Sequence, residues 1–121
     1  TYGFCSPTLG TKISSRVAPK LDQHASHECN RQGKAICDRL GAAVDFIIED
    51  EDMIEVAQWI TENLKFDRMY LYGRTKPMHI SLSYAPACNV TFMVPSPSGR
   101  LMPRACSPDE IPVFAQKLSN F

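Results

Sequence analysis

The stretch AAVDFII, residues 42–48, and the segment DMIEVAQWITENLK, residues 52–65, decide the fold class. The first is short and apolar and ends in aromatic and β-branched residues, which predicts a mostly buried strand. Asp52 with Glu55 forms an acidic variant of a capping box, which is typical of a helix start. Apolar residues then recur at helical spacing and predict an amphipathic helix over 52–65: they are Met53, Val56, Ala57, Ile60 and Leu64.

More strands are predicted after this helix. They cover residues 68–72, 78–84 and 90–94, with a further candidate at 100–103, and prolines and glycines separate them. A closing helix is predicted over 108–118. Strands that follow one another, instead of alternating with helices, predict an α+β fold with a small, mostly antiparallel central sheet and helices packed on it. At 121 residues the whole chain, 1–121, is expected to form a single domain.

The bulk composition argues against several classes of partner. Thirteen basic and thirteen acidic side chains cancel, so a nucleic acid partner is not expected. The longest apolar run, residues 42–48, is too short to cross a bilayer, so no membrane association is expected. The first residues lack the basic start and apolar stretch of a signal peptide, and a cytoplasmic location is therefore expected. Five scattered cysteines favour reduced thiols: Cys5, Cys29, Cys37, Cys88 and Cys106.

Polar residues inside two predicted strands indicate a metal site. Asp45 places a carboxylate in the middle of an apolar strand, which is costly unless it is paired or bound to a cation. His79 opens another strand after a proline-containing turn. The irregular segment 18–40 adds His24 and His27, and long loops in compact domains are usually functional or disordered. An aspartate and a histidine on neighbouring strands with a loop histidine would give a zinc shell with one position left for water.

The order of these segments resembles the zinc-binding core of the hedgehog/D-Ala-D-Ala peptidase superfamily. The similar parts are GAAVDF at 41–46, a helix, FDRMY at 66–70 and PMHIS at 77–81. The family pattern runs S-x-H-x-x-G-x-A-x-D, then a helix, an F-D-apolar-Y strand and H-x-H before another strand. The resemblance covers about residues 14–84 and implies the fold of that superfamily.

The resemblance also implies a set of site residues. In the family the first histidine, the aspartate and the final histidine hold zinc. Carried onto this sequence, Zn²⁺ would be bound by Asp45, by His79 and by either His24 or His27. The serine-arginine segment upstream implies that Arg16 faces the substrate and orients its carboxylate.

The sequence departs from the family pattern in two places. His24 and His27 lie seventeen and fourteen residues before Gly41 (41 − 24 and 41 − 27), whereas the family has four or fewer, so an insertion must loop out. The family's catalytic glutamate precedes the last histidine, but YGRTKPM at 72–78 contains no carboxylate. Since a general base must reach the water that it deprotonates, hydrolysis lacks its expected base.

Two functions from different classes remain open. The first is a zinc-dependent peptidase or amidohydrolase acting on peptidoglycan peptides or on a related ligand with a carboxylate, for example as a phage lysin. The alternative is a non-hydrolytic ligand-binding or structural module that retains the fold, with or without the metal. The ligand set is compatible with both functions, whereas the missing glutamate favours the second.

Two further pairs of side chains are predicted near this site. Arg74 and Lys76, in the turn before His79, are candidates for binding an anion or are solvated turn residues. Tyr70 and Tyr72 alternate with apolar residues and either line a ligand site or pack within the sheet.

Overall fold

The computed structural model describes residues 23–25, 29–37, 41–118 and 121. The sequence predicts the strands and helices between residues 42 and 118 to within a few positions, although the last strand runs three residues further than predicted. No helix in these described ranges is long and apolar enough to cross a membrane. The elements are, in chain order, η2 (Gln23–Ala25), β1 (Ala42–Phe46), α2 (Met53–Asn63), β2 (Arg68–Leu71), β3 (Met78–Leu82), β4 (Asn89–Pro95), β5 (Leu101–Cys106), η3 (Pro108–Glu110) and α3 (Ile111–Lys117).

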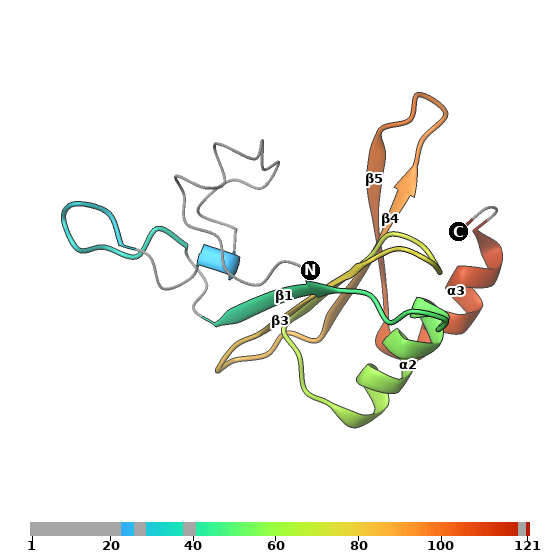
Figure 1. Ribbon diagram of the computed structural model, residues 1–121, viewed down its shortest axis with the longest axis horizontal. Coiled ribbons are helices and arrows are strands. Elements are labelled where there is room, and N and C mark those ends of the chain that lie inside the picture. The colour runs from blue at the N-terminus through green and yellow to red at the C-terminus, as the bar shows by residue number, and fades with distance from the viewer. Residues whose placement is uncertain (1–22, 26–28, 38–40, 119–120) are drawn as a thin grey trace.

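The five strands form one mixed sheet in the order β1-β3-β2-β4-β5 (Figure 1). β1 and β2 both pair with β3 in antiparallel orientation, and β4 pairs with β5 in the same way. β2 and β4 are parallel. The predicted α+β class is therefore confirmed, with three antiparallel pairings and one parallel pairing in the sheet.

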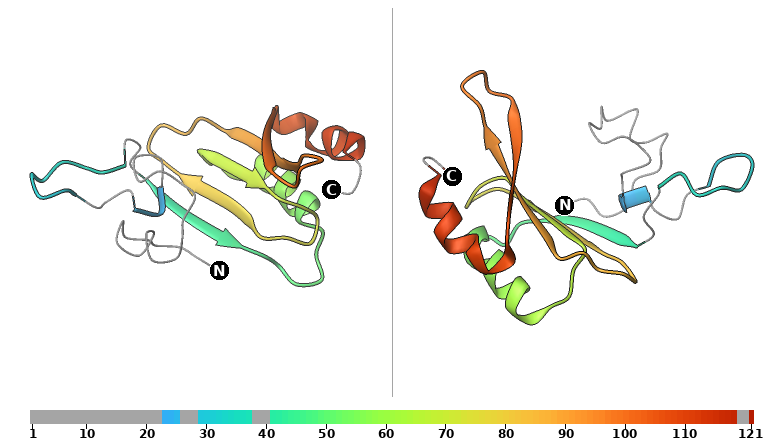
Figure 2. Two further views of the ribbon diagram at one scale, coloured as in Figure 1. Left: turned by 90° about the horizontal axis from the view of Figure 1, so that it is seen from above. Right: turned by 180° about the vertical axis from the view of Figure 1, so that it is seen from behind.

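Helices α2 and α3 cover one face of this sheet, whereas η2 lies over the other face (Figures 1 and 2). Alternate strand residues point toward the helices and form a core with their apolar faces. At its centre, the ring of Phe92 lies 4.9 Å from that of Phe114 and 4.9 Å from that of Phe121, measured between centroids. The buried apolar residues of this core are Met53, Ile54, Ala57, Ile60, Phe66, Met69, Leu71, Met78, Val90, Phe92, Ile111 and Ala115.

The start of α2 is fixed as the sequence predicts, by Asp52. Its carboxylate accepts a hydrogen bond from the Ile54 backbone N–H at 2.8 Å and caps the helix. The Arg74 guanidinium pairs with the same carboxylate, and the Arg74 carbonyl accepts the Met53 N–H at 2.8 Å. The predicted apolar face ends earlier than expected, because Leu64 is the exposed C-cap of the helix.

The prediction of a mostly buried strand at 42–48 is wrong. β1 ends at Phe46, and along the described chain it pairs only with β3, so it lies at an edge of the sheet. Val44 is 37% exposed, and Ile47 and Ile48 beyond the strand are 43% and 44% exposed. An apolar run indicates a strand, but its burial depends on which neighbours cover it.

Residues 29–37 form a small turn of their own whose exposed tip projects away from the sheet (Figure 1), whereas Cys37 at its end is buried. Cys29 and Ala35 make an isolated antiparallel bridge. Asn30 closes the turn, because its side-chain oxygen accepts the N–H groups of Gln32 and Lys34 at 3.0 Å each. The turn is therefore held together largely by hydrogen bonds within the segment.

Candidate metal site

Strand register brings Asp45 and His79 side by side. Asp45 on β1 is opposite His79 on β3, and His79 is opposite Tyr70 on β2. Opposed residues on neighbouring strands project to the same face of a sheet. Met78 and Ile80 flank His79 and point the other way, into the helix-covered core. The three residues Asp45, His79 and Tyr70 therefore form a row on the face opposite the helices.

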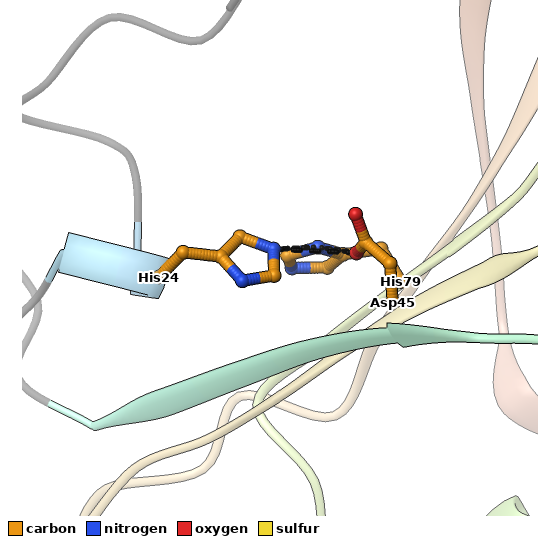
Figure 3. A group of neighbouring side chains, drawn as sticks. All are labelled: His24, Asp45 and His79. Atoms are coloured by element: carbon orange, nitrogen blue, oxygen red, sulfur yellow. Dashed lines mark hydrogen bonds and ion pairs between the residues drawn. The ribbon is translucent and has the colours of Figure 1, made fainter. Parts of the chain in front are cut away.

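The third member of the site comes from outside the sheet. His24 is the central residue of the short helix η2, and its ring reaches down to Asp45 and His79 (Figure 3). The side chain of His24 is buried, whereas the other two are partly exposed. The choice between His24 and His27 that the sequence left open is thus answered in part: His24 lies at the site, and His27 lies outside the described residues.

The three potential ligand atoms form a small triangle. His24 Nε2 lies 3.2 Å from Asp45 Oδ1 and 3.1 Å from His79 Nδ1, and His79 Nδ1 lies 2.8 Å from Asp45 Oδ1. Hydrogen bonds alone do not account well for all three short contacts. If both ring nitrogens donate to the Asp45 oxygen, their two N–H groups also face each other. A tetrahedral ion with bonds of about 2.0–2.1 Å separates its ligand atoms by about 3.3 Å, so the observed edges match within about 0.5 Å. The group could therefore hold a metal ion.

Electrostatics favour an ionised carboxylate in this group. Burial by itself would raise the pKa of Asp45, but hydrogen bonds and attraction from His24 and His79 outweigh it and hold that pKa well below its usual value. Asp45 is therefore anionic at neutral pH, the form in which a carboxylate binds a cation.

Two tyrosines lie beside the group of His24, Asp45 and His79, one on β2 and one just after it. The Tyr70 ring stands edge-on to His79, with centroids 5.3 Å apart and planes at 70°. Tyr72 is two residues further along, just after the end of β2, and it is close enough to Asp45 to feel that carboxylate's charge. Burial raises the pKa of Tyr72, and the charges of Asp45 and Tyr70 raise it further. Tyr72 is thus a protonated phenol near the site, and as a donor it differs from the glutamate that the resemblance led us to expect.

Arg74 and Lys76 lie in the turn before β3 and do not join His24, Asp45 and His79. Arg74 is not at the site, because it pairs with Asp52 at the start of α2 and its N–H donates to the Phe121 carbonyl. Lys76 is exposed in the same turn. Arg16 falls outside the described residues, so its predicted role stays a prediction.

Sequence reasoning missed one contact beside His24. Gln23 Nε2 donates to Asp67 Oδ2 at 3.0 Å, and both side chains are buried. The available signal was the carboxylate of Asp67 next to an apolar strand, which calls for a partner just as Asp45 does. Its partner lies 44 residues away.

Comparison with known proteins adds no family to these observations. No family model, no curated protein and no solved structure matched the chain.

Proposed function

We propose that the protein is a zinc-dependent peptidase or amidohydrolase with a fold of the hedgehog/D-Ala-D-Ala peptidase type. Its substrate would be a peptide with a free carboxylate, and peptidoglycan peptides are the first to test. One observation carries the proposal: three ligand atoms from His24, Asp45 and His79 converge within 4.8 Å of one another. Two imidazoles and one carboxylate are ligands that zinc accepts, and catalytic zinc sites use three protein ligands and keep one position open.

Each residue of the site then has a defined part. A bound zinc ion would polarise a substrate carbonyl and lower the pKa of coordinated water. The anionic Asp45 would offset part of the ion's charge. Tyr72, protonated at neutral pH, would donate a hydrogen bond to an oxygen of the substrate. Arg16 is proposed to hold the substrate carboxylate, as the resemblance implies.

A second candidate, a zinc-binding module without hydrolysis, is favoured by a different observation. The segment 72–78 has no carboxylate, and Tyr72 is protonated where a general base is needed. In such a module the same three residues would hold the metal, and the open position would bind a ligand without cleaving it.

Metal content separates both candidates from a protein without a metal. Purified wild type should contain about one zinc per chain, since a three-ligand site binds one ion. Asp45→Ala and His79→Ala should each lose the zinc. Asp109→Ala removes an exposed carboxylate that is not part of the site, and this variant should keep the zinc. Stoichiometric zinc that survives both Asp45→Ala and His79→Ala would exclude the assignment.

Hydrolysis separates the two candidates from each other. Zinc-loaded protein is incubated with muropeptides, and the products are identified by mass spectrometry. The peptidase proposal expects release of an amino acid or short peptide, with Tyr72→Phe slowing turnover about tenfold or more while metal content is unchanged. Tyr84→Phe is the matched control, since Tyr84 is fully exposed. Full zinc content with no cleavage would favour the binding module.

A further inference from the structure

His24 needs a support that its own helix does not supply. η2 has only three residues, Gln23–Ala25, and does not belong to the sheet. Asp45 and His79, in contrast, are fixed by the ladder between β1 and β3. A metal site requires its ligands to be held to within about 0.5 Å, so a separate contact must place η2 on the sheet.

Gln23 makes such a contact from the residue next to His24. Its side chain is 3% exposed, and its Nε2 donates to Asp67 Oδ2 at 3.0 Å. An amide that donates to a carboxylate forms a charge-assisted hydrogen bond, which is stronger than a neutral one. Because both groups are buried, breaking the bond would leave polar atoms without water to replace it.

Asp67, at the other end of this bond, is itself held on several sides. It is fully buried just before β2, and its second oxygen, Oδ1, accepts the Ala87 N–H at 2.9 Å. Its own N–H donates to the Ser81 carbonyl on β3 at 2.7 Å. Its carbonyl accepts the Asn89 N–H at the start of β4 at 3.0 Å. Asp67 is therefore tied to β3, to the first residue of β4 and to the loop just before β4.

We propose that the Gln23–Asp67 hydrogen bond is a latch that positions the third metal ligand. Gln23 and Asp67 touch neither the metal nor a substrate and act through His24. They are positioning residues for the metal site, and this inference rests on the proposed function of that site. Loss of an outer contact that orients a ligand typically lowers metal affinity 10- to 100-fold.

The test exchanges the two partners of the latch. Gln23→Glu places two carboxylates against each other and should weaken zinc binding about tenfold or more, measured by competition with a chromophoric chelator. Asp67→Asn alone should have a smaller effect, because the Gln23 amide can turn its oxygen toward the new donor. In the double variant Gln23→Glu/Asp67→Asn the new amide donates to the new carboxylate, and affinity should return to within about threefold of wild type.

Two controls show whether the effect passes through the ligand. Gln32→Glu makes the same charge change on the exposed turn and should leave affinity unchanged. In a His24→Ala background, Gln23→Glu should cause no further loss, because the ligand that it positions is already gone. A destabilised fold alone would instead lower affinity in both backgrounds.

The outcomes for the latch and for the metal site are distinguishable. If wild type binds zinc and His24→Ala weakens it, but Gln23→Glu binds like wild type, the latch is excluded and the metal site stands. Failure of the double variant to recover, when its thermal unfolding matches wild type, would also exclude the latch. If wild type binds no zinc, the proposed function itself is wrong.

Discussion

The sheet and the helix η2 build the same site by different means. β1 and β3 hold Asp45 and His79 through a ladder of five aligned residue pairs, so backbone hydrogen bonds fix both ligands. η2 brings His24 to the same place with three residues, and its Gln23 side chain bonds to Asp67 just before β2. Two of the three proposed ligands thus lie in the sheet, whereas the third comes from a short helix outside it. A change in η2 should alter the metal site without unfolding the protein, and a change in the core should abolish both.

Removing the core beneath the sheet should have the largest effect. Phe92→Ala deletes a fully buried ring that packs on Phe114 and Phe121. We expect the free energy of unfolding to fall by about 3–5 kcal/mol, measured by urea denaturation of the metal-free protein. Val113→Ala, on the exposed side of α3, should change it by less than about 0.5 kcal/mol. Equal effects of the two variants would mean that the core is not where the structure places it.

Removing the ligand outside the sheet should separate metal binding from folding. His24→Ala is expected to lower zinc affinity more than about 100-fold, since it removes a ligand and not merely its support. The unfolding free energy of the metal-free protein should stay within about 1 kcal/mol of wild type. His27→Ala serves as the matched variant and should retain zinc; a loss in His27→Ala without a loss in His24→Ala would reverse the assignment.

Thiol reactivity should differ between the sheet and the turn at 29–37. Burial raises the pKa of Cys106 on β5 to about 11, and the carboxylates of Glu110 and Asp109 contribute. A raised pKa keeps the thiol protonated, so at pH 8 its thiolate fraction is about 100-fold or more below that of an ordinary cysteine. Alkylation, followed by peptide mass spectrometry, should therefore be slow at Cys106 and fast at exposed Cys29. The rate at Cys106 should rise about tenfold per pH unit between pH 8 and 10; a plateau near pH 9 would contradict the raised pKa.

Glycine substitutions should distinguish the start of β1 from the turn at 29–37. Gly41, just before β1, has φ of +149°, and a Cβ there would collide with the Leu82 carbonyl of β3. Gly41→Ala is expected to lower the free energy of unfolding by about 2–6 kcal/mol, measured by thermal unfolding, because the positive φ and the clash with the β3 backbone both oppose it. Gly33→Ala also meets a positive φ, of +78°, but has open space around it, so only the strained backbone should count and the cost should be about 1–2 kcal/mol. A larger cost at Gly33 would show that the turn at 29–37 contributes more to the fold than its contacts indicate.

Local patterns predicted the elements well because their causes are local. Helical spacing and Asp52 located α2, and the Asp52 carboxylate caps the helix by accepting the Ile54 N–H at 2.8 Å. Asp45 and His79 were recognisable because a polar group inside an apolar strand needs a partner. Their register across two strands then followed from the fold.

What the sequence did not reveal depends on contacts between distant residues. The exposure of β1 follows from its place at the sheet edge, which no residue within 42–48 encodes. The sequence left Arg74 open as an anion-binding or a solvated turn residue, and did not show its partner Asp52, which lies 22 residues away at the start of α2. The choice of His24 follows from the position of η2 on the sheet, and the Gln23–Asp67 contact spans 44 residues.

The turn at 29–37 lies in the sequence between His24 and Asp45 but outside the site that these residues form. Asn30 holds this turn together through hydrogen bonds within the segment, and the tip of the turn points away from the sheet. The turn should therefore tolerate changes in its length. The entropy of closing a flexible loop grows only logarithmically, by about 0.6 kcal/mol for each doubling in length. A peptide epitope inserted at the tip of the turn should leave the three potential ligand atoms in place. A metal site of this kind can therefore keep its geometry while the number of residues between its ligands drifts.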